Sequence, residues 1–305
     1  MTGDKMTKSR RKRRENYQGW LSVLPVLLIL LGVRAVPIVT MAVKSFTNWD
    51  GILKSDFIGL RNYIQIFTKG EFCHLLGNNL ILLIFIPIQV MLGMIVAVLL
   101  YEEVWGWKIF RTIYYIPQII SSVIVGYLFT ILFGYYGPVN MALRFLGLDG
   151  LAVEWLGNRG SGLFVIIFCL VWINIGWQGM LVLGGLSSIP PEIYESARLD
   201  GAGYWQRLFR ITIPLLRRTI EYSVMTSVIW SFTGLFPLIF SLTHGGPGTE
   251  TMTIDYMIYQ KSFVSGSQMG YSCALSVVLL LIILIFTGVQ MAITQRRDRL
   301  EAEGR

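Results

Sequence analysis

One polar stretch between two long apolar segments has residue types and spacing suited to docking on a partner protein. It covers residues 192–214 and reads EIYESARLDGAGYWQRLFRITIP. Ser-Ile-Pro-Pro at 188–191 ends the preceding segment, because proline cannot continue a helix and disfavours helical geometry in the residue before it. Asp-Gly-Ala-Gly at 200–203 favours a turn, since glycine permits positive φ angles. We therefore predict a short helix, a glycine turn and a second short helix that could fill a groove of a partner.

Polar and aromatic side chains within three apolar segments could hold an uncharged solute. Aromatic faces and neutral hydrogen-bonding groups are the side chains that suit a sugar. Asn174 and Gln178 lie four residues apart and share a helix face. The tryptophans could equally serve packing, and the amides could equally hydrogen-bond between helices. The candidates for a substrate path are Gln118, Ser122, Trp172, Asn174, Trp177, Gln178, Ser231 and Phe236.

The chain has no motif for catalysis or for cofactor binding. It lacks a GxxxxGK[ST] phosphate loop, an HExxH motif and a GxSxG motif. Glu195 has no partner for acid–base chemistry, so a docking contact or a favourable charge at a helix N-terminus is its expected role. Three separated cysteines and two single histidines indicate neither a disulfide framework nor a metal site. We predict no catalytic residue, no metal ligand and no cofactor in this chain.

Composition predicts an all-α membrane protein. The 305 residues are 54% hydrophobic and 14% charged, whereas soluble domains carry about 25% charged residues. A membrane-spanning helix needs about 20 apolar residues. Six segments meet this requirement, at 19–43, 78–101, 113–134, 163–186, 218–242 and 270–293. We therefore predict a polytopic bundle of six transmembrane helices with a helix-turn-helix loop.

The distribution of Lys and Arg predicts the orientation. These residues concentrate in the N-terminal tail, in the loops after the second and fourth spans, and in the C-terminal tail. Such segments face the cytoplasm, so both termini and the 192–214 stretch are predicted to be cytoplasmic. The predicted parts are a basic tail over 1–16, a membrane domain over 17–293 with its loop at 187–215, and a tail over 294–305. The net charge of +8 fits anionic membrane lipid, and we expect no nucleic-acid partner.

The 192–214 stretch resembles the EAA loop in permease subunits of binding-protein-dependent ABC importers. The family pattern is Glu-Ala-Ala, three residues, Gly, nine residues, Ile, one residue and Leu-Pro. Glu195-Ser196-Ala197, Gly201 and Ile211-Thr212-Ile213-Pro214 keep this spacing, with Ser196 and Ile213 as departures. In the family the loop docks onto the ATP-hydrolysing subunit. The resemblance therefore implies an ATPase-coupling role for Glu195, Ser196, Ala197, Asp200, Gly201, Ala202, Ile211 and Pro214.

Other positions are similar to those of carbohydrate-uptake permeases. They are Asn48-Trp49, 59–63, Pro117, 137–140 and Gly245-Gly246-Pro247 with Thr249. The Gly-Gly-Pro turn is similar to that of the subunits exemplified by maltose and glycerol-phosphate importers. The resemblance covers nearly all of the chain after the basic tail.

This resemblance implies a multi-pass subunit of the bacterial cytoplasmic (inner) membrane that imports a sugar or related polyol. The implied partners are a second permease subunit forming a heterodimer, two ATP-binding subunits that hold ATP and Mg, and an extracytoplasmic solute-binding protein. The alternative from the residues is a secondary transporter driven by an ion gradient. Such a carrier would need ionisable residues at mid-membrane, and spans two to six contain few of them.

Overall fold

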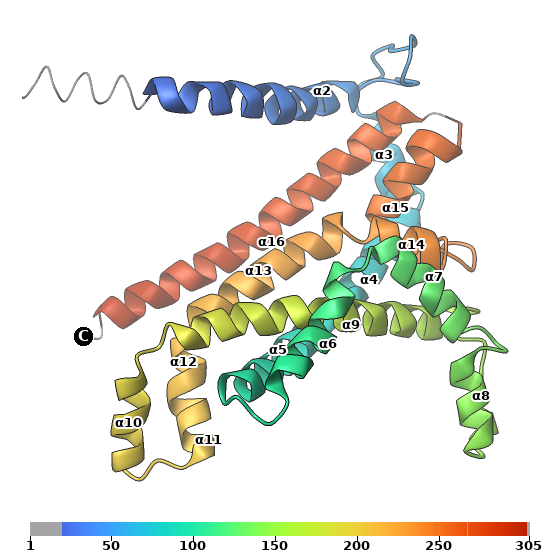
Figure 1. Cartoon of the computed structure of the whole chain (residues 1–305). Coiled ribbons are helices and arrows are strands. Elements are labelled where there is room, and N and C mark those ends of the chain that lie inside the picture. The colour runs from blue at the N-terminus through green and yellow to red at the C-terminus, as the bar shows by residue number, and fades with distance from the viewer. Residues whose placement is uncertain (1–19, 267, 304–305) are drawn as a thin grey trace, which may run out of the picture. The chain divides into compact units, whose positions relative to one another are not determined.

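A computed structural model describes residues 20–266 and 268–303 as helices joined by loops and turns (Figure 1). The described residues contain no strand beyond an isolated bridge between Thr47 and Phe57. Contacts divide the chain into one unit of residues up to 64 with 261–277, and a second unit of 65–260 with 278–305. The all-α prediction is confirmed. The predicted tail at 1–16 lies outside the described residues, as do positions 304 and 305.

Within the described residues, four helical segments are long and apolar enough to cross a membrane. They are Trp20–Lys44, Glu71–Tyr101, Arg159–Ser187 and Met269–Leu300. Two bent pairs also qualify, Trp107–Ile119 with Ser122–Leu132 at 99° and Arg217–Thr233 with Phe236–Leu242 at 52°. Counting each pair as one span gives six spans at the six predicted positions.

The second unit contains most of the helices of these spans. Their bounds are α4 (Glu71–Leu82), α5 (Phe85–Tyr101), α6 (Trp107–Ile119), α7 (Ser122–Leu132), α9 (Arg159–Ser187), α13 (Arg217–Thr233) and α14 (Phe236–Leu242). Outside the spans lie α8 (Pro138–Phe145) and α15 (Ile254–Tyr259). The last helix, α16 (Met269–Glu303), extends through most of the predicted C-terminal tail.

The bend between α6 and α7 falls after Pro117 rather than at it. Pro117 lies inside α6, and the break follows at Ile120 and Ser121, whose ψ angles of 137° and 133° are not helical. The bend between α13 and α14 follows Gly234, and a proline stands in the first turn of α14. Proline has no backbone N–H to donate. A helix break next to a proline therefore leaves fewer N–H groups without a partner than a break elsewhere would.

Small residues let the helices of the second unit approach closely. A Cβ added at Gly93 of α5 would collide with the side chain of Gln178 on α9. A Cβ added at Gly176 of α9 would lie 2.7 Å from the carbonyl oxygen of Tyr114 on α6. A Cβ added at Gly126 of α7 would collide with Ser241 of α14. Close backbone approach at small residues is a main source of helix packing in membranes.

The first unit contains the first span and the loop that follows it. The span runs from Trp20 to Lys44 and ends in α2 (Val36–Lys44). The buried amide of Asn62, in α3 (Arg61–Thr68), donates to the carbonyl oxygens of Ser45 and Thr47 at 2.8 and 2.9 Å. These bonds close the loop back onto the end of the span.

Gly93→Ala should destabilise the protein, because the added methyl group would collide with Gln178 and lie 3.1 Å from the backbone nitrogen of Gly179. Overpacking of this kind costs about 1–3 kcal/mol. Thermal unfolding of the purified chain in detergent measures the loss. Gly184→Ala is the matched control, because Gly184 is also helical and a Cβ there meets no atom within 4 Å. Equal melting temperatures would contradict this packing.

Candidate coupling loop and translocation pocket

The polar stretch at 192–214 forms the predicted helix-turn-helix. Its first helix is α10 (Pro191–Leu199), and its second comprises α11 (Tyr204–Arg207), a π-helical turn at Leu208–Thr212 and α12 (Ile213–Leu215). Figure 1 shows α10 and α11 side by side, joined by the turn at their far ends. The second helix continues through Ile211 to Pro214 without a break, because the π turn joins α11 to α12.

The turn depends on Gly201. Its φ angle is +78°, in the region where a side chain is disfavoured. The N–H of Ala202 donates to the carbonyl of Ala197 at 2.9 Å, and the N–H of Gly201 donates to the carbonyl of Arg198 at 3.0 Å. This is the usual way in which a left-handed glycine ends a helix. A Cβ at Gly201 would meet no atom within 4 Å, so the requirement for glycine is conformational and not steric.

The predicted coupling residues occupy different positions on this loop. Ala197 is buried, whereas Glu195, Ser196, Asp200 and Gly201 are exposed. Asp200 ends α10, Ala202 follows the turn, Ile211 lies in the π turn and Pro214 lies in α12. Ala197 therefore anchors the loop, and the exposed members are accessible to a partner.

The loop also exposes three large apolar side chains that were not among the candidate coupling residues. Leu199, Trp205 and Phe209 are 89%, 67% and 61% exposed. The rings of Trp205 and Phe209 are stacked with centroids 6.0 Å apart. Their spacing of four residues places them on one helix face, and this was the available signal. Exposed apolar groups of this size are typical of a protein interface.

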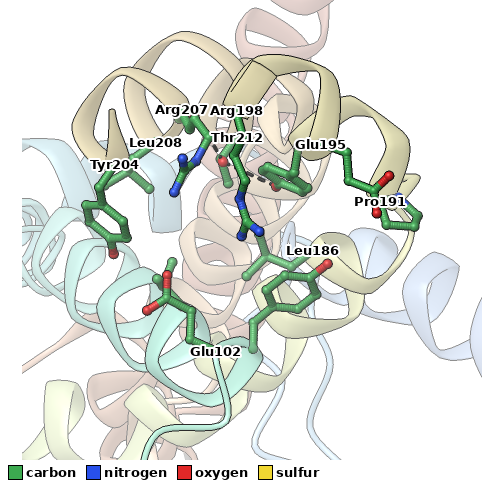
Figure 2. Close-up of a pocket in the computed structure, with 12 residues that line it drawn as sticks. Glu102, Leu186, Pro191, Glu195, Arg198, Tyr204, Arg207, Leu208 and Thr212 are labelled. Carbon is green, nitrogen blue, oxygen red and sulfur yellow. Dashed lines mark hydrogen bonds between the residues drawn. The ribbon is translucent and has the colours of Figure 1, made fainter. Parts of the chain in front are cut away.

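A cavity of about 260 Å³ separates the loop from the end of α5 (Figure 2). Four charged residues from three segments line it, namely Glu102, Glu195, Arg198 and Arg207. The guanidinium of Arg207 donates to the carbonyl of Ala202 at 3.0 Å. Burial raises the pKa of the Tyr204 hydroxyl, and the Glu102 carboxylate raises it further, although Arg207 opposes the shift.

An apolar cluster anchors the loop beside this cavity. Ala97 of α5, Val182 and Leu186 of α9, Ile189 and Leu216 form a buried cluster, against which Tyr194 of α10 packs. The hydroxyl groups of Tyr194 and Thr212 lie 3.2 Å apart and join the two helices of the loop. A displacement of the loop would therefore be transmitted to α5 and α9.

A second cavity of about 260 Å³ lies among four spans. Phe85 of α5, Gln118 of α6, Asn174 and Trp177 of α9, and Thr226, Ser227 and Trp230 of α13 line it. Gln118, Asn174 and Trp177 are thus brought together as the sequence predicted. The candidates for a substrate path did not include Phe85, Thr226, Ser227 and Trp230, and only the tertiary structure brings them to this place.

This pocket is neutral and has spare hydrogen-bonding capacity. None of its lining residues is charged. The Gln118 side-chain oxygen is buried and has no hydrogen-bond partner in the described structure. Gln89 donates to the Ser227 hydroxyl at 2.7 Å, and its own buried side-chain oxygen lacks a partner among the described residues. A buried acceptor without a partner is costly, so a hydroxyl-bearing solute would be stabilised here.

The other five predicted path residues lie outside this pocket. Ser122 begins α7 at the bend, and Trp172 packs on Phe129 with ring centroids 5.4 Å apart. Gln178 is buried against α5 and accepts a hydrogen bond from Ser223. The Ser231 hydroxyl donates to the carbonyl of Val228 at 2.7 Å. The ring of Phe236 packs on that of Tyr259, with centroids 4.7 Å apart. Their present contacts are with other parts of the protein.

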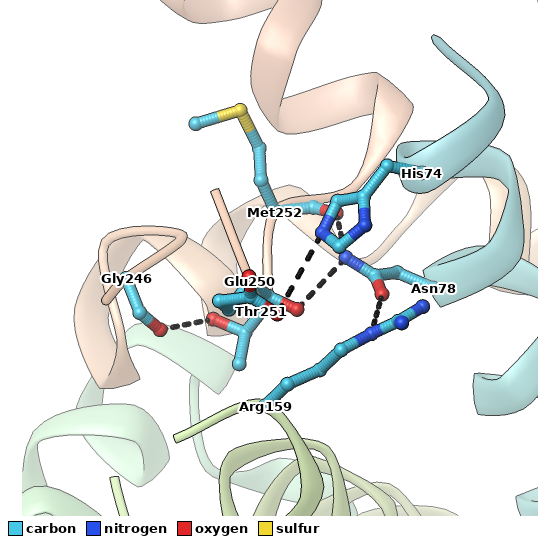
Figure 3. A network of polar contacts seen from close by, with 7 residues as sticks. All are labelled: His74, Asn78, Arg159, Gly246, Glu250, Thr251 and Met252. Atoms are coloured by element: carbon cyan, nitrogen blue, oxygen red, sulfur yellow. Dashed lines mark hydrogen bonds and ion pairs between the residues drawn. The ribbon is translucent and has the colours of Figure 1, made fainter. Parts of the chain in front are cut away.

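A polar network joins α4, the start of α9 and the loop after α14 (Figure 3). The Asn78 amide nitrogen donates to the carbonyls of Glu250 and Met252 at 3.0 and 2.9 Å. The Asn78 oxygen accepts from Arg159 Nε at 2.9 Å. His74 Nε2 lies 3.9 Å from a Glu250 carboxylate oxygen. This network fixes the loop that contains the Gly-Gly-Pro turn against two spans.

Comparison with known proteins identifies the family. The model of the family described as "Binding-protein-dependent transport system inner membrane component" matches residues 89–299, which contain the loop and every lining residue of the membrane pocket except Phe85. The chain belongs to this family. It is therefore a multi-pass inner-membrane component of a binding-protein-dependent transport system. This membership excludes the ion-gradient-driven alternative.

Individual relatives agree with this assignment. The chain is 35% identical over 280 residues to the "Probable ABC transporter permease protein YurN" of Bacillus subtilis, covering 89% of this chain and 94% of the relative. It is 32% identical to the "Multiple sugar-binding transport system permease protein MsmF" of Streptococcus mutans, covering 94% and 98%. A crystal structure of a bacterial ABC transporter that imports the acidic polysaccharide alginate matches with a TM-score of 0.79 at 25% identity, covering 95% and 99%.

Asn78→Ala should loosen the loop after α14 in this permease, because two carbonyl groups and Arg159 would lose their partner. Each unsatisfied buried group costs about 1–3 kcal/mol. Limited proteolysis at residues 244–252 and thermal unfolding measure the effect.

His74→Gln is the control for this network, because it removes only the 3.9 Å contact to Glu250. Exposed pairs of this kind contribute about 1 kcal/mol or less. If the two variants resist protease equally, Asn78 is not the centre of the network.

Proposed function

We propose that this chain is one of two permease subunits of an ATP-driven importer for a neutral sugar or related polyol. The membrane pocket carries this proposal, because its aromatic walls and neutral amides and hydroxyls suit a polyhydroxylated solute. The sugar transport named in one relative supports the solute class. The matched alginate importer carries an acidic polysaccharide, whereas no Lys or Arg lines this pocket.

The proposed assembly has four further components. A second permease subunit forms a heterodimer with this chain, and two ATP-binding subunits hold ATP and Mg. An extracytoplasmic solute-binding protein delivers the solute, as the family description indicates. Both termini and the coupling loop face the cytoplasm, in agreement with the excess of Lys and Arg in those segments. ATP hydrolysis belongs to the partner subunits.

The coupling loop supports a mechanism for energy transfer. ATP binding closes the two ATPase subunits, and their motion displaces the loop. Leu199, Trp205 and Phe209 provide exposed apolar area for docking. The cluster formed with Ala97 and Leu216 passes the displacement to α5 and α9. Both helices contribute to the walls of the membrane pocket, so movement of the loop alters access to the solute.

Gln118→Ala and Asn174→Ala should each weaken solute uptake about tenfold, because each removes a polar group from the pocket. Uptake by the reconstituted importer at several solute concentrations measures this. Thr112→Ala is the control on α6, because the Thr112 hydroxyl is exposed, donates to the carbonyl of Lys108 in its own helix, and does not line the pocket. Unchanged uptake in both pocket variants would place the solute elsewhere.

Gly201→Ala should uncouple transport, because alanine at a φ of +78° costs about 1–2 kcal/mol. The expected result is reduced co-purification of the ATPase subunits and reduced uptake, with normal membrane insertion. Gly203→Ala is the matched control two residues away, because Gly203 has a φ of −66° and a Cβ there also meets no atom within 4 Å. Normal association and uptake in the Gly201 variant would show that the loop is only a connector.

A further inference from the structure

The second unit has a groove that the proposed transport mechanism does not use. It lies between α13 and α16, encloses about 310 Å³, and is lined along most of its length by apolar side chains. These are Ile220, Val224 and Val228 from α13, and Phe286, Val289 and Ile293 from α16. Their spacing of three or four residues places each set on one face of its helix.

The apolar part of the groove is shaped for a chain. Phe286, Val289 and Ile293 remain 37%, 55% and 50% exposed. The eight residues from Glu221 to Val228 extend about 10 Å along α13, because each of the steps between them rises 1.5 Å. This length accommodates a segment of a fatty-acyl chain, which would cover these side chains.

The polar part of the groove lies near the N-terminal end of α13, which follows the coupling loop, and near the C-terminal end of α16. Glu221, Gln290, Thr294 and Arg297 lie there. The Glu221 carboxylate accepts from Arg217 Nε at 2.9 Å, and the Gln290 amide donates to the Glu221 carbonyl at 3.1 Å. The negative charge of Glu221 is therefore already compensated by a partner outside the groove.

Arg297 is the cation that remains at this end of the groove. It forms no ion pair within the described part of the chain. Gln290, Thr294 and Arg297 are spaced by four and three residues and share a face of α16. An arginine can place its aliphatic stem on apolar surface while its guanidinium reaches the membrane interface. Cationic residues near the cytoplasmic membrane surface attract the phosphates of anionic lipids.

We propose that this groove binds one anionic phospholipid. An acyl chain lies along Val224, Val228 and Val289, and the headgroup phosphate accepts hydrogen bonds from Arg297 and Thr294. A helix of the second permease subunit is a poorer occupant. It would cover Arg297, and only a helix with an acidic residue at that point would supply the negative charge. The site is independent of the solute and of the ATPase contact.

The test uses the full chain, in its assembled importer, reconstituted in nanodiscs with labelled phosphatidylglycerol or phosphatidylcholine. Arg297→Gln should weaken phosphatidylglycerol binding about fivefold and phosphatidylcholine binding much less, because the choline cation already neutralises the phosphate of phosphatidylcholine. Arg299→Gln is the matched control, because residue 299 lies about 200° around the helix from 297 and does not line the groove. Native mass spectrometry should find one retained phosphatidylglycerol in the Arg299 variant and a reduced amount in the Arg297 variant.

A second pair of variants tests the acyl-chain part. Val228→Phe fills the groove while retaining Arg297 and should also reduce the retained lipid, whereas Leu284→Phe on α16, outside the groove, should not. Gel filtration confirms assembly of each variant. Equal retention in the Arg297 and Arg299 variants overturns the headgroup site. Cross-linking of a Val289→Cys variant to the second permease subunit in every assembled complex would show that a protein covers the groove, and would likewise overturn the proposal.

Discussion

The pairing of backbone polar groups in an apolar medium is the constraint on which the rest of this structure depends. A membrane offers no water to an unpaired N–H, so a spanning segment is stable only as a helix or where protein supplies the missing partners. Two spans here are broken. At the second break, the Asp255 carboxylate accepts from the backbone N–H of Phe236 at 2.7 Å, from the Thr253 hydroxyl at 2.6 Å and from the N–H of Tyr256 at 2.9 Å. Burial raises the pKa of Asp255, and these hydrogen bonds oppose that shift.

The same constraint explains how the helices around the breaks are held. The Thr130 hydroxyl of α7 donates to the carbonyl of Gly126 in its own helix at 3.0 Å and to the carbonyl of Leu242 at 3.2 Å. Gly126 has no side chain, which lets α14 approach α7 closely there. Asn79 of α4 donates to the carbonyl of Ser231 at 3.2 Å and accepts from the N–H of Ile254 at 3.1 Å. Amide side chains thus replace the helical partners that the broken segments lack.

The proposed function uses places where this pairing is incomplete. The buried side-chain oxygens of Gln118 and Gln89 have no hydrogen-bond partner among the described residues, and in that proposal a hydroxylated solute supplies the donors. The proposed coupling loop is different, because Leu199, Trp205 and Phe209 are exposed and two backbone hydrogen bonds close the Gly201 turn. Such a turn would present a preformed surface to a partner, whereas the pocket would be satisfied only while it holds a solute.

Much of this protein could be predicted from its sequence alone. Apolar length determines the spans, because about 20 residues are needed to cross a bilayer, and all six predicted positions contain spanning helices or bent pairs. The helix-turn-helix at 191–215 and the positive φ of Gly201 followed from proline and glycine chemistry, which is local. Gln118, Asn174 and Trp177 were identifiable as polar and aromatic residues in apolar surroundings, and they share one pocket.

Only the tertiary structure decided which of the other candidates face that pocket. Trp172, Gln178, Ser231 and Phe236 have the same character, but their contacts are with Phe129, Ser223, Val228 and Tyr259. Thr226, Ser227 and Trp230 reach the pocket because α13 packs beside α9 with that face inward. A hydropathy pattern specifies that a segment lies in a membrane. It does not specify which side chains face a neighbouring helix and which face lipid, because both surroundings are apolar. The facing of each helix depends instead on close contacts such as Gly93 with Gln178, between residues far apart in the sequence.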